Sequence, residues 1–211
     1  GLTLALITGQ ATLDAYSHYR ANQTVAQLAQ LDKAFFKALL NFRSERGDSA
    51  TALTLPVSQA SGSITSVINA RKSVDAAMQD ARAAAEGVDI PAVSSALASV
   101  SAVYDKVLAL RQKVDQTLTV DLATREKGLD KTVLDLGQQF LVALEDASTA
   151  LEGEMRGLDG EMLGLIQIRA HAWAARAHGG TATVVLNAPI AAGRALDAAE
   201  AAKVAGSDGA A

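Results

Sequence analysis

Apolar side chains recur every three or four positions along most of this chain, and this spacing places them on one face of an α-helix. The pattern predicts a long first helix over residues 13–53. Turn-forming residues at 55–62 end it, and Ser63 fits the N-cap of a second helix over residues 64–85. Both predicted helices are longer than the helices of an average globular protein.

The rest of the chain predicts further helices of the same kind. Gly87 fits a helix stop, and Pro91 fits the first turn of the next helix. A break near residues 119–121 stays open, and the best strand candidate, 181–186, has Ala-rich flanks that favour a helix end. The further predicted helices cover residues 91–119, 122–155, 161–186 and 190–204. We therefore expect an all-α fold, an elongated bundle of about six long antiparallel helices.

Composition supports this expectation and excludes several classes of protein. Hydrophobic residues make up 49% of the chain, aromatic residues only 4%, and proline occurs three times, which suits closely packed helices. With no cysteine, disulfides and thiolate metal sites are excluded. The net charge of −4 and the absence of any Lys/Arg block longer than two residues argue against a nucleic-acid partner.

The N-terminal run at residues 1–9 is apolar and uncharged but shorter than the roughly 20 residues that cross a bilayer. It is either the tail of a membrane span or a plain first helical turn. Tyr16, Tyr19 and Arg20 are residue types common at a membrane interface, which favours the span. We divide the chain into a span tail or leading helix at 1–15, a helical bundle at 16–205 and a flexible tail at 206–211.

A pattern of Arg-x3-Gly-x5-Leu-x2-Pro-aliphatic occurs twice, at residues 43–57 and 176–190. An internal repeat of this kind predicts repeated architecture. Each half would be a long helix, with an arginine and a glycine near its far end, followed by a turn and a returning helix. Two related helical hairpins of this form would build the elongated bundle.

The segment Phe-Arg-Ser-Glu-Arg-Gly at residues 42–47, with Arg71 and Asp75 on the following helix, resembles the nitrate- and nitrite-sensing (NIT-type) helical sensor domains of bacterial transmembrane receptors such as methyl-accepting chemotaxis proteins. The resemblance covers residues 28–85 well and 165–196 weakly. It implies a periplasmic domain of an inner-membrane receptor, in which arginines from separate helices clamp a small anion. The family domain runs longer, which implies that this chain ends before its closing helices.

Four arginines are the candidates for binding such an anion, because guanidinium groups hold planar oxyanions through paired hydrogen bonds and stay charged at any relevant pH. The first two are spaced i, i+3 and the last two i, i+7, so each pair shares a helix face. The candidates are Arg43, Arg46, Arg169 and Arg176. The alternative is that they form salt bridges with acids on their own or other helices. In the second repeat Ala177-His178-Gly179 stands in place of the Glu-Arg pair, which leaves the anion specificity open.

Other chemistry has little support in the sequence. His171 and His178 are spaced i, i+7, whereas a metal pair on a helix prefers i, i+4 with nearby acids. Nucleophile-elbow, phosphate-loop and dinucleotide fingerprints are absent. We therefore expect no enzyme, cofactor or metal site. The hypothesis is a homodimeric ligand-sensing domain for signal transduction such as chemotaxis; the alternative is a ligand-free structural or protein-interaction bundle.

Overall fold

The computed structural model describes residues 2–158, 168, 171, 185–186, 189–190 and 194–208. All regular structure in these residues is helical, with no strand among them, which confirms the all-α expectation. The chain divides into two compact units, Gly1–Met162 and Leu163–Ala211. The described helix of the second unit is α6, Ala198–Asp208.

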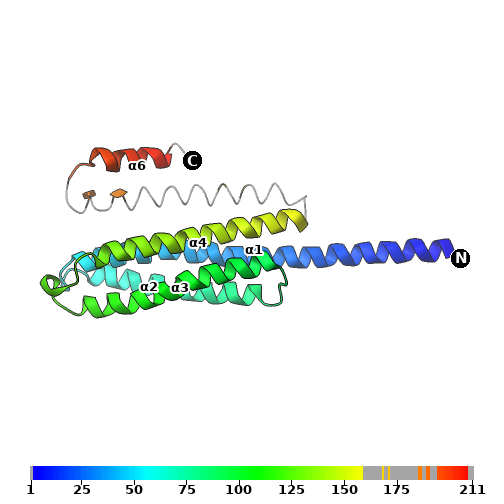
Figure 1. Cartoon of the computed structure of the whole chain (residues 1–211), viewed down its shortest axis with the longest axis horizontal. Helices are drawn as coiled ribbons and strands as arrows, with labels where there is room; N and C mark the ends of the chain where they lie inside the picture. Colours follow the sequence, from blue (N-terminus) through cyan, green and yellow to red (C-terminus); the bar gives the residue numbers. More distant parts are fainter. Residues whose placement is uncertain are drawn as a thin grey trace. The chain divides into compact units, whose positions relative to one another are not determined.

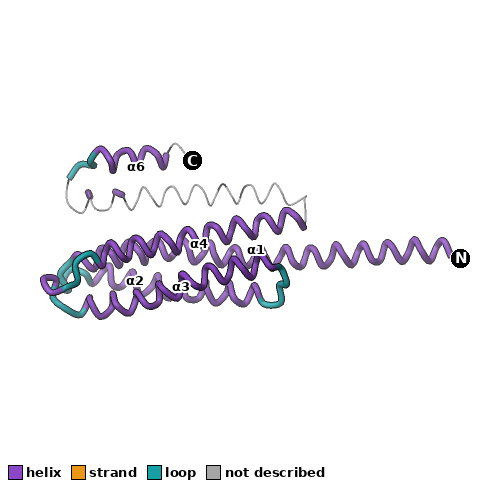
Figure 2. Tube along the Cα trace, in the orientation of Figure 1, coloured by secondary structure: helices purple, strands orange, loops and turns teal. Residues whose placement is uncertain are grey.

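The first unit is a bundle of four helices whose successive members run in opposite directions (Figures 1 and 2). Helix α1 packs closely against α2 and α4, and α3 packs against α4, whereas α2 and α3 approach each other less closely. The four helices are α1 (Leu2–Thr54), α2 (Ser61–Ala85), α3 (Pro91–Leu118) and α4 (Leu129–Leu158). A short 3-10 helix, η1 (Leu122–Thr124), lies between α3 and α4.

Large apolar side chains of α1 and α4 form the centre of this bundle. Phe35 and Phe140 are fully buried, and the Phe140 ring lies edge-on to Phe42, with 4.8 Å between ring centroids. The same ring stacks on Tyr104 of α3 at 5.4 Å. On α2 the buried face carries mostly small side chains, such as Ala77, which let α1 and α2 approach closely. Three of the four helices therefore meet around one aromatic group.

Several predicted helix ends are correct and others are wrong. Helix α3 begins at Pro91, and Gly87 adopts the positive φ of 76° that a helix stop favours. Ser63, however, is not an N-cap: α2 already begins at Ser61, and its N-cap Ala60 makes no side-chain hydrogen bond. Helices α3 and α4 are separated by residues 119–128, so the predicted helix start at residue 122 is wrong; Gly128, with φ of 85°, lies directly before α4.

The predicted six helices and two hairpin halves are not confirmed. Among the described residues there are five α-helices, and the predicted sixth helix, 190–204, is replaced by α6. Most of the predicted fifth helix and of the second repeat, including Arg176, lies outside the described residues. The boundaries at residues 15 and 205 stay predictions; α1 continues through the first without a break, and α6 continues through the second.

Helix α3 is the one described helix that is long and apolar enough to cross a membrane, with a mean hydropathy of 1.3 over its most apolar stretch. In the structure this helix contributes Val100, Tyr104 and Val107 to the interior of the bundle, and it also buries Arg111 there. The apolar character of α3 is thus used at least in part for packing against the other helices of the bundle.

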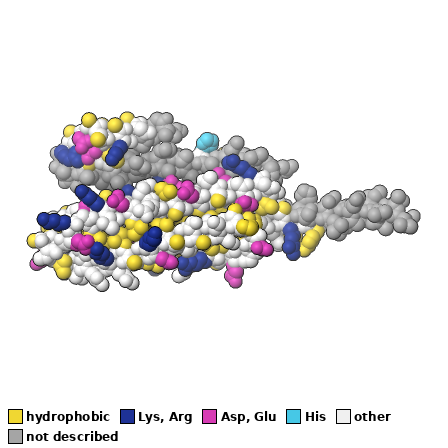
Figure 3. Space-filling model, in the orientation of Figure 1, with side chains coloured by type: hydrophobic (Ala, Val, Ile, Leu, Met, Phe, Trp, Pro, Cys, Tyr) yellow, Lys and Arg dark blue, Asp and Glu magenta, His cyan; other side chains and the backbone are white. Residues whose placement is uncertain are grey.

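Basic and acidic side chains are interspersed over the described part of the first unit. On the face drawn in Figure 3, dark-blue Lys and Arg side chains lie among magenta Asp and Glu side chains, and that face has no extended basic patch.

Candidate functional site

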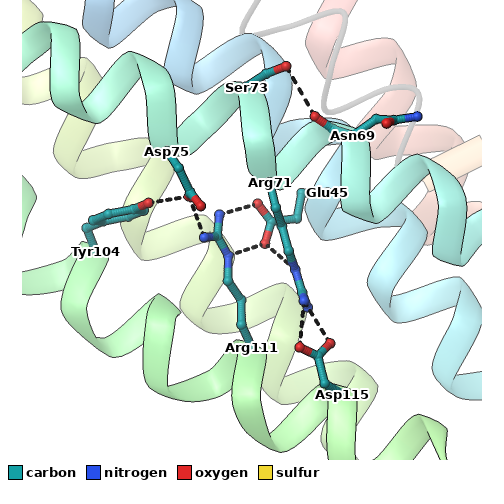
Figure 4. A network of polar contacts seen from close by, with 8 residues as sticks. All are labelled: Glu45, Asn69, Arg71, Ser73, Asp75, Tyr104, Arg111 and Asp115. Carbon is teal, nitrogen blue, oxygen red and sulfur yellow. Dashed lines mark hydrogen bonds and ion pairs between the residues drawn. The ribbon is translucent and has the colours of Figure 1, made fainter.

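A buried ion pair joins α1 to α3 in the bundle interior (Figure 4). Glu45 of α1 is 3% exposed and Arg111 of α3 is 8% exposed. The Nε and Nη2 atoms of Arg111 donate to Oε1 and Oε2 of Glu45, at 2.6 Å and 2.7 Å. This two-bond, fork-to-fork arrangement is the strongest geometry that a guanidinium offers to a planar anion.

A second arginine shares the same carboxylate. Arg71 of α2 donates from Nε to Oε1 of Glu45 at 3.3 Å and from Nη1 to both oxygens of Asp115, at 2.7 Å and 2.8 Å. Arg111 also donates from Nη1 to Oδ1 of Asp75 at 2.6 Å. Glu45 therefore links α1 to both α2 and α3, and each arginine has a second carboxylate partner that is partly exposed.

Tyr104 completes this set of contacts, since its hydroxyl donates to Oδ1 of Asp75. Its ring lies below the Arg111 guanidinium, 5.6 Å from Cζ to the ring centroid, which is within cation–π range. Tyr104 thus connects the aromatic core to the charged groups. We call the six residues together the Glu45 network: Glu45, Arg71, Asp75, Tyr104, Arg111 and Asp115.

The electrostatics of the network follow from burial and pairing. Burial acts to lower the pKa of Arg111, but hydrogen bonds and charge attraction from Glu45, and then from Asp75, outweigh it and raise that pKa. Burial, together with the hydrogen bond to Asp75, raises the pKa of Tyr104 to about 12. Both groups therefore keep their protons at neutral pH, so all their N–H and O–H donors remain available.

The local sequence explains how charged groups come to lie inside the bundle. Arg111 stands four residues after Val107 and three before Val114, both buried, so it occupies a position of the apolar stripe of α3. Arg71 stands in the same way between Val67 and Val74 on α2. The helical period directs each arginine inward, and the network satisfies the polar groups that would otherwise be buried without partners.

A small cavity of about 20 Å³ lies against the network. This is enough space for about one water molecule. Three guanidinium-bearing residues from α1, α2 and α3 lie on it, together with Glu45 and mostly apolar neighbours. Its lining consists of Phe42, Glu45, Arg46, Ser49, Arg71, Val107, Leu110, Arg111, Val114, Val133 and Gly137.

Arg46 is the least completely paired of these arginines. Its Nη1 donates to Oε1 of Gln138 at 2.8 Å, but its buried Nε has no hydrogen-bond partner. Burial, with the nearby charge of Arg43 as the second cause, lowers the pKa of Arg46. The side chain crosses α4 at Gly137, where an added Cβ would lie 2.6 Å from Cδ of Arg46. A glycine at 137 is what lets Arg46 lie along the cavity.

The four arginines predicted from the sequence are only partly located. Arg43 forms an ion pair with Glu145 of α4 at 3.6 Å, which is the alternative of pairing with an acid on another helix. Arg46 lines the cavity. Arg169 and Arg176 lie outside the described residues, so a site built from all four stays a prediction.

The sequence reasoning missed Arg111 as a site residue and used Arg71 only as part of a resemblance. The available signal was an arginine within an apolar stripe, at a position where neighbours three and four residues away are valines. Within the described residues, no group of three or more His, Cys, Asp or Glu side chains could hold a metal ion.

Comparisons of this chain with protein-family models, with curated proteins and with solved structures find no match. The fold and the site therefore define the class to which the chain belongs: an all-helical protein whose first unit is a four-helix bundle with a buried arginine–carboxylate network.

Proposed function

We propose that this chain is the extracytoplasmic ligand-sensing domain of a membrane-anchored bacterial signal-transduction receptor, and that it binds a small anion between its helices. The observation that carries the proposal is the convergence of Arg46, Arg71 and Arg111, from three helices, on one cavity inside the bundle. Resemblance of residues 42–47 to nitrate- and nitrite-sensing domains points to a ligand of the nitrate or small-carboxylate type.

The chemistry of the cavity supports an anion over a neutral or cationic ligand. A buried guanidinium is costly unless an anion or a set of acceptors satisfies it, and the Nε of Arg46 lacks such an acceptor. The lowered pKa of Arg46 has the same physical origin, namely burial next to another positive charge. An anion placed beside Arg46 would offset both effects. The cavity of about 20 Å³ holds about one water, so even a ligand of few atoms would require a side chain of the site to move.

Helix α1 is the proposed path of the signal. It contributes Glu45 and Arg46 to the site and continues without a break to Leu2, about 65 Å away at 1.5 Å per residue. A ligand that prefers one placement of α1 against α2 and α3 would shift the population toward that placement.

We further propose that the receptor is a homodimer in the inner membrane, with this region in the periplasm.

A second function is favoured by a specific observation. Arg71 and Arg111 already have carboxylate partners within the Glu45 network, so neither requires a ligand. On this alternative the chain is a ligand-free structural or protein-interaction bundle, and the network fixes the register of its helices.

Thermal unfolding with added nitrate, nitrite, formate or acetate distinguishes the two functions. A ligand at 100 times its dissociation constant stabilises the folded state by about 2.7 kcal/mol. We expect a shift for the wild type and for Arg82→Gln, which removes an exposed arginine on α2, and a smaller shift for Arg46→Gln. The absence of a wild-type shift with every anion, or an equal shift in Arg46→Gln, would contradict the proposal.

A further inference from the structure

We propose that the Glu45 carboxylate occupies the position of the ligand, so that a planar anion binds by displacing Glu45 from Arg71 and Arg111. This inference rests on the proposed function, because it assumes that an anion enters the bundle. It goes further in naming the atoms that the ligand contacts and the internal group with which it competes.

The geometry of the ion pair carries the first step. Both oxygens of Glu45 are held by one guanidinium, through Nε and Nη2 of Arg111, and one of them also accepts from Nε of Arg71. A formate, acetate or nitrate ion presents two oxygens in one plane with nearly the same separation as a glutamate carboxylate. It can therefore make the same bonds to the same donors.

The volume of the site carries the second step. The cavity of about 20 Å³ holds about one water, so it cannot take a planar three- or four-atom anion in addition to Glu45. Glu45, Arg71 and Arg111 all line this cavity, and Glu45 already accepts from Nε of Arg71 and from Nε and Nη2 of Arg111. An anion that reaches these donors must take the place of the carboxylate.

The remaining contacts keep the arginines in place when Glu45 leaves. Asp115 holds Arg71 by two bonds from Nη1, and Asp75 holds Arg111 by one bond from Nη1. These carboxylates belong to α2 and α3, as do the arginines, so the receiving half of the site is complete without α1. Two positioned guanidinium groups then face the incoming ligand.

Displacement has a consequence for α1. Within the Glu45 network, Glu45 is the sole residue of α1, and every bond from α1 to the other members passes through its carboxylate. An anion in its place is held by Arg71 of α2 and Arg111 of α3, and unlike the Glu45 carboxylate it is not covalently part of α1, so any remaining link to α1 would come from Arg46. Ligand binding would therefore release this tie between α1 and its two neighbours.

Chemical rescue tests the displacement. Glu45→Ala removes the competing carboxylate and leaves its space open, whereas Glu145→Ala removes a carboxylate that pairs with Arg43 outside the network. We expect formate, acetate and nitrate to raise the melting temperature of Glu45→Ala at a half-saturating concentration at least about tenfold below that of the wild type, a difference of about 1.4 kcal/mol. Glu145→Ala should respond as the wild type does.

Glu45→Gln keeps the size of the side chain and provides a second variant if Glu45→Ala does not fold without an anion. In that variant a half-saturating concentration below the wild-type value supports the inference. Equal half-saturating concentrations in the wild type and both variants would overturn the displacement and leave the proposed function standing. Rescue of the variants without any wild-type response would overturn both, because Glu45 would then be a fixed structural partner.

Discussion

Replacement of Arg125 tests how the bundle closes the C-terminal end of α1. Arg125 lies in the connection between α3 and α4 and is 8% exposed. Its Nη1 lies 3.0 Å from the carbonyl oxygens of Ala52 and Leu53 and 2.8 Å from that of Leu55, and its Nε donates to Val120. The last carbonyl groups of a helix have no partner within it, so one arginine satisfies several of them here.

The expected magnitude follows from these bonds. A hydrogen bond from a charged donor contributes about 1.5–3 kcal/mol, but three of the carbonyls share one nitrogen, so the bonds are not additive. A positive charge at a helix C-terminus adds about 0.3–1 kcal/mol. We expect Arg125→Ala to lower the free energy of unfolding by about 3 kcal/mol. Arg125→Lys should lower it by a smaller amount, because the ammonium keeps the positive charge but cannot reach all the carbonyls together.

Urea unfolding followed by circular dichroism measures this loss. Lys127→Ala, which removes an exposed positive charge from the same connection, is the matched control and should leave the midpoint nearly unchanged. The midpoint for Arg125→Ala should fall at an unchanged slope, as expected for lost stability without a change in the exposed surface. If the midpoints of Arg125→Ala and Lys127→Ala agree, the capping role is refuted.

Three further predictions concern the site. Arg111→Met should destabilise the bundle by about 3–5 kcal/mol, and adding Glu45→Leu should restore much of that loss, since a buried Glu45 that keeps only its 3.3 Å bond to Arg71 costs more than no ion pair. Urea midpoints of the single and double variants decide this. Gly137→Ala should destabilise the bundle by about 1–3 kcal/mol, because the added methyl group meets the Arg46 side chain. Gly153→Ala, in open space on the same helix, should stabilise it by up to about 1 kcal/mol. Equal effects of the two substitutions would contradict the close approach of Arg46 to Gly137. The pKa of Tyr104 is raised from about 10 in the unfolded chain to about 12 in the folded chain. The stability that this shift contributes is therefore complete below pH about 10 and is lost as the pH rises through about 12. Tyr104→Phe should remove the tyrosine absorbance step near pH 12 and flatten the dependence of stability on pH between these values.

Hydrophobic periodicity predicted most of the first unit correctly, because long amphipathic helices leave a regular pattern. Pro91 and Gly87 identify their helix ends through backbone preferences that hold in any context. The connection at residues 119–128 was not predictable in the same way. It contains apolar Val120 and Leu122, so its composition does not mark it as a polar loop, and both side chains are exposed in the structure.

The site was less predictable than the fold, since side-chain partners depend on which helix faces lie together. Spacing alone places Arg43 and Arg46 near one another but does not show that both reach toward α4. Glu45 stands between them and faces α2 and α3 instead. The buried position of Arg111 was visible from its place in the apolar stripe of α3, four residues after Val107 and three before Val114, whereas its partner Glu45 was not visible.

The wider spacing between α2 and α3 has a consequence for motion. The other neighbouring pairs are held by interlocking apolar side chains, which fit in one arrangement only, whereas α2 and α3 are joined largely through flexible arginine and aspartate side chains. Such side chains can change rotamer and keep their hydrogen bonds while the helices separate slightly. Amide hydrogens on the facing sides of α2 and α3 should therefore exchange with solvent sooner than those of the α1–α4 core, which makes this interface the natural entrance to the interior.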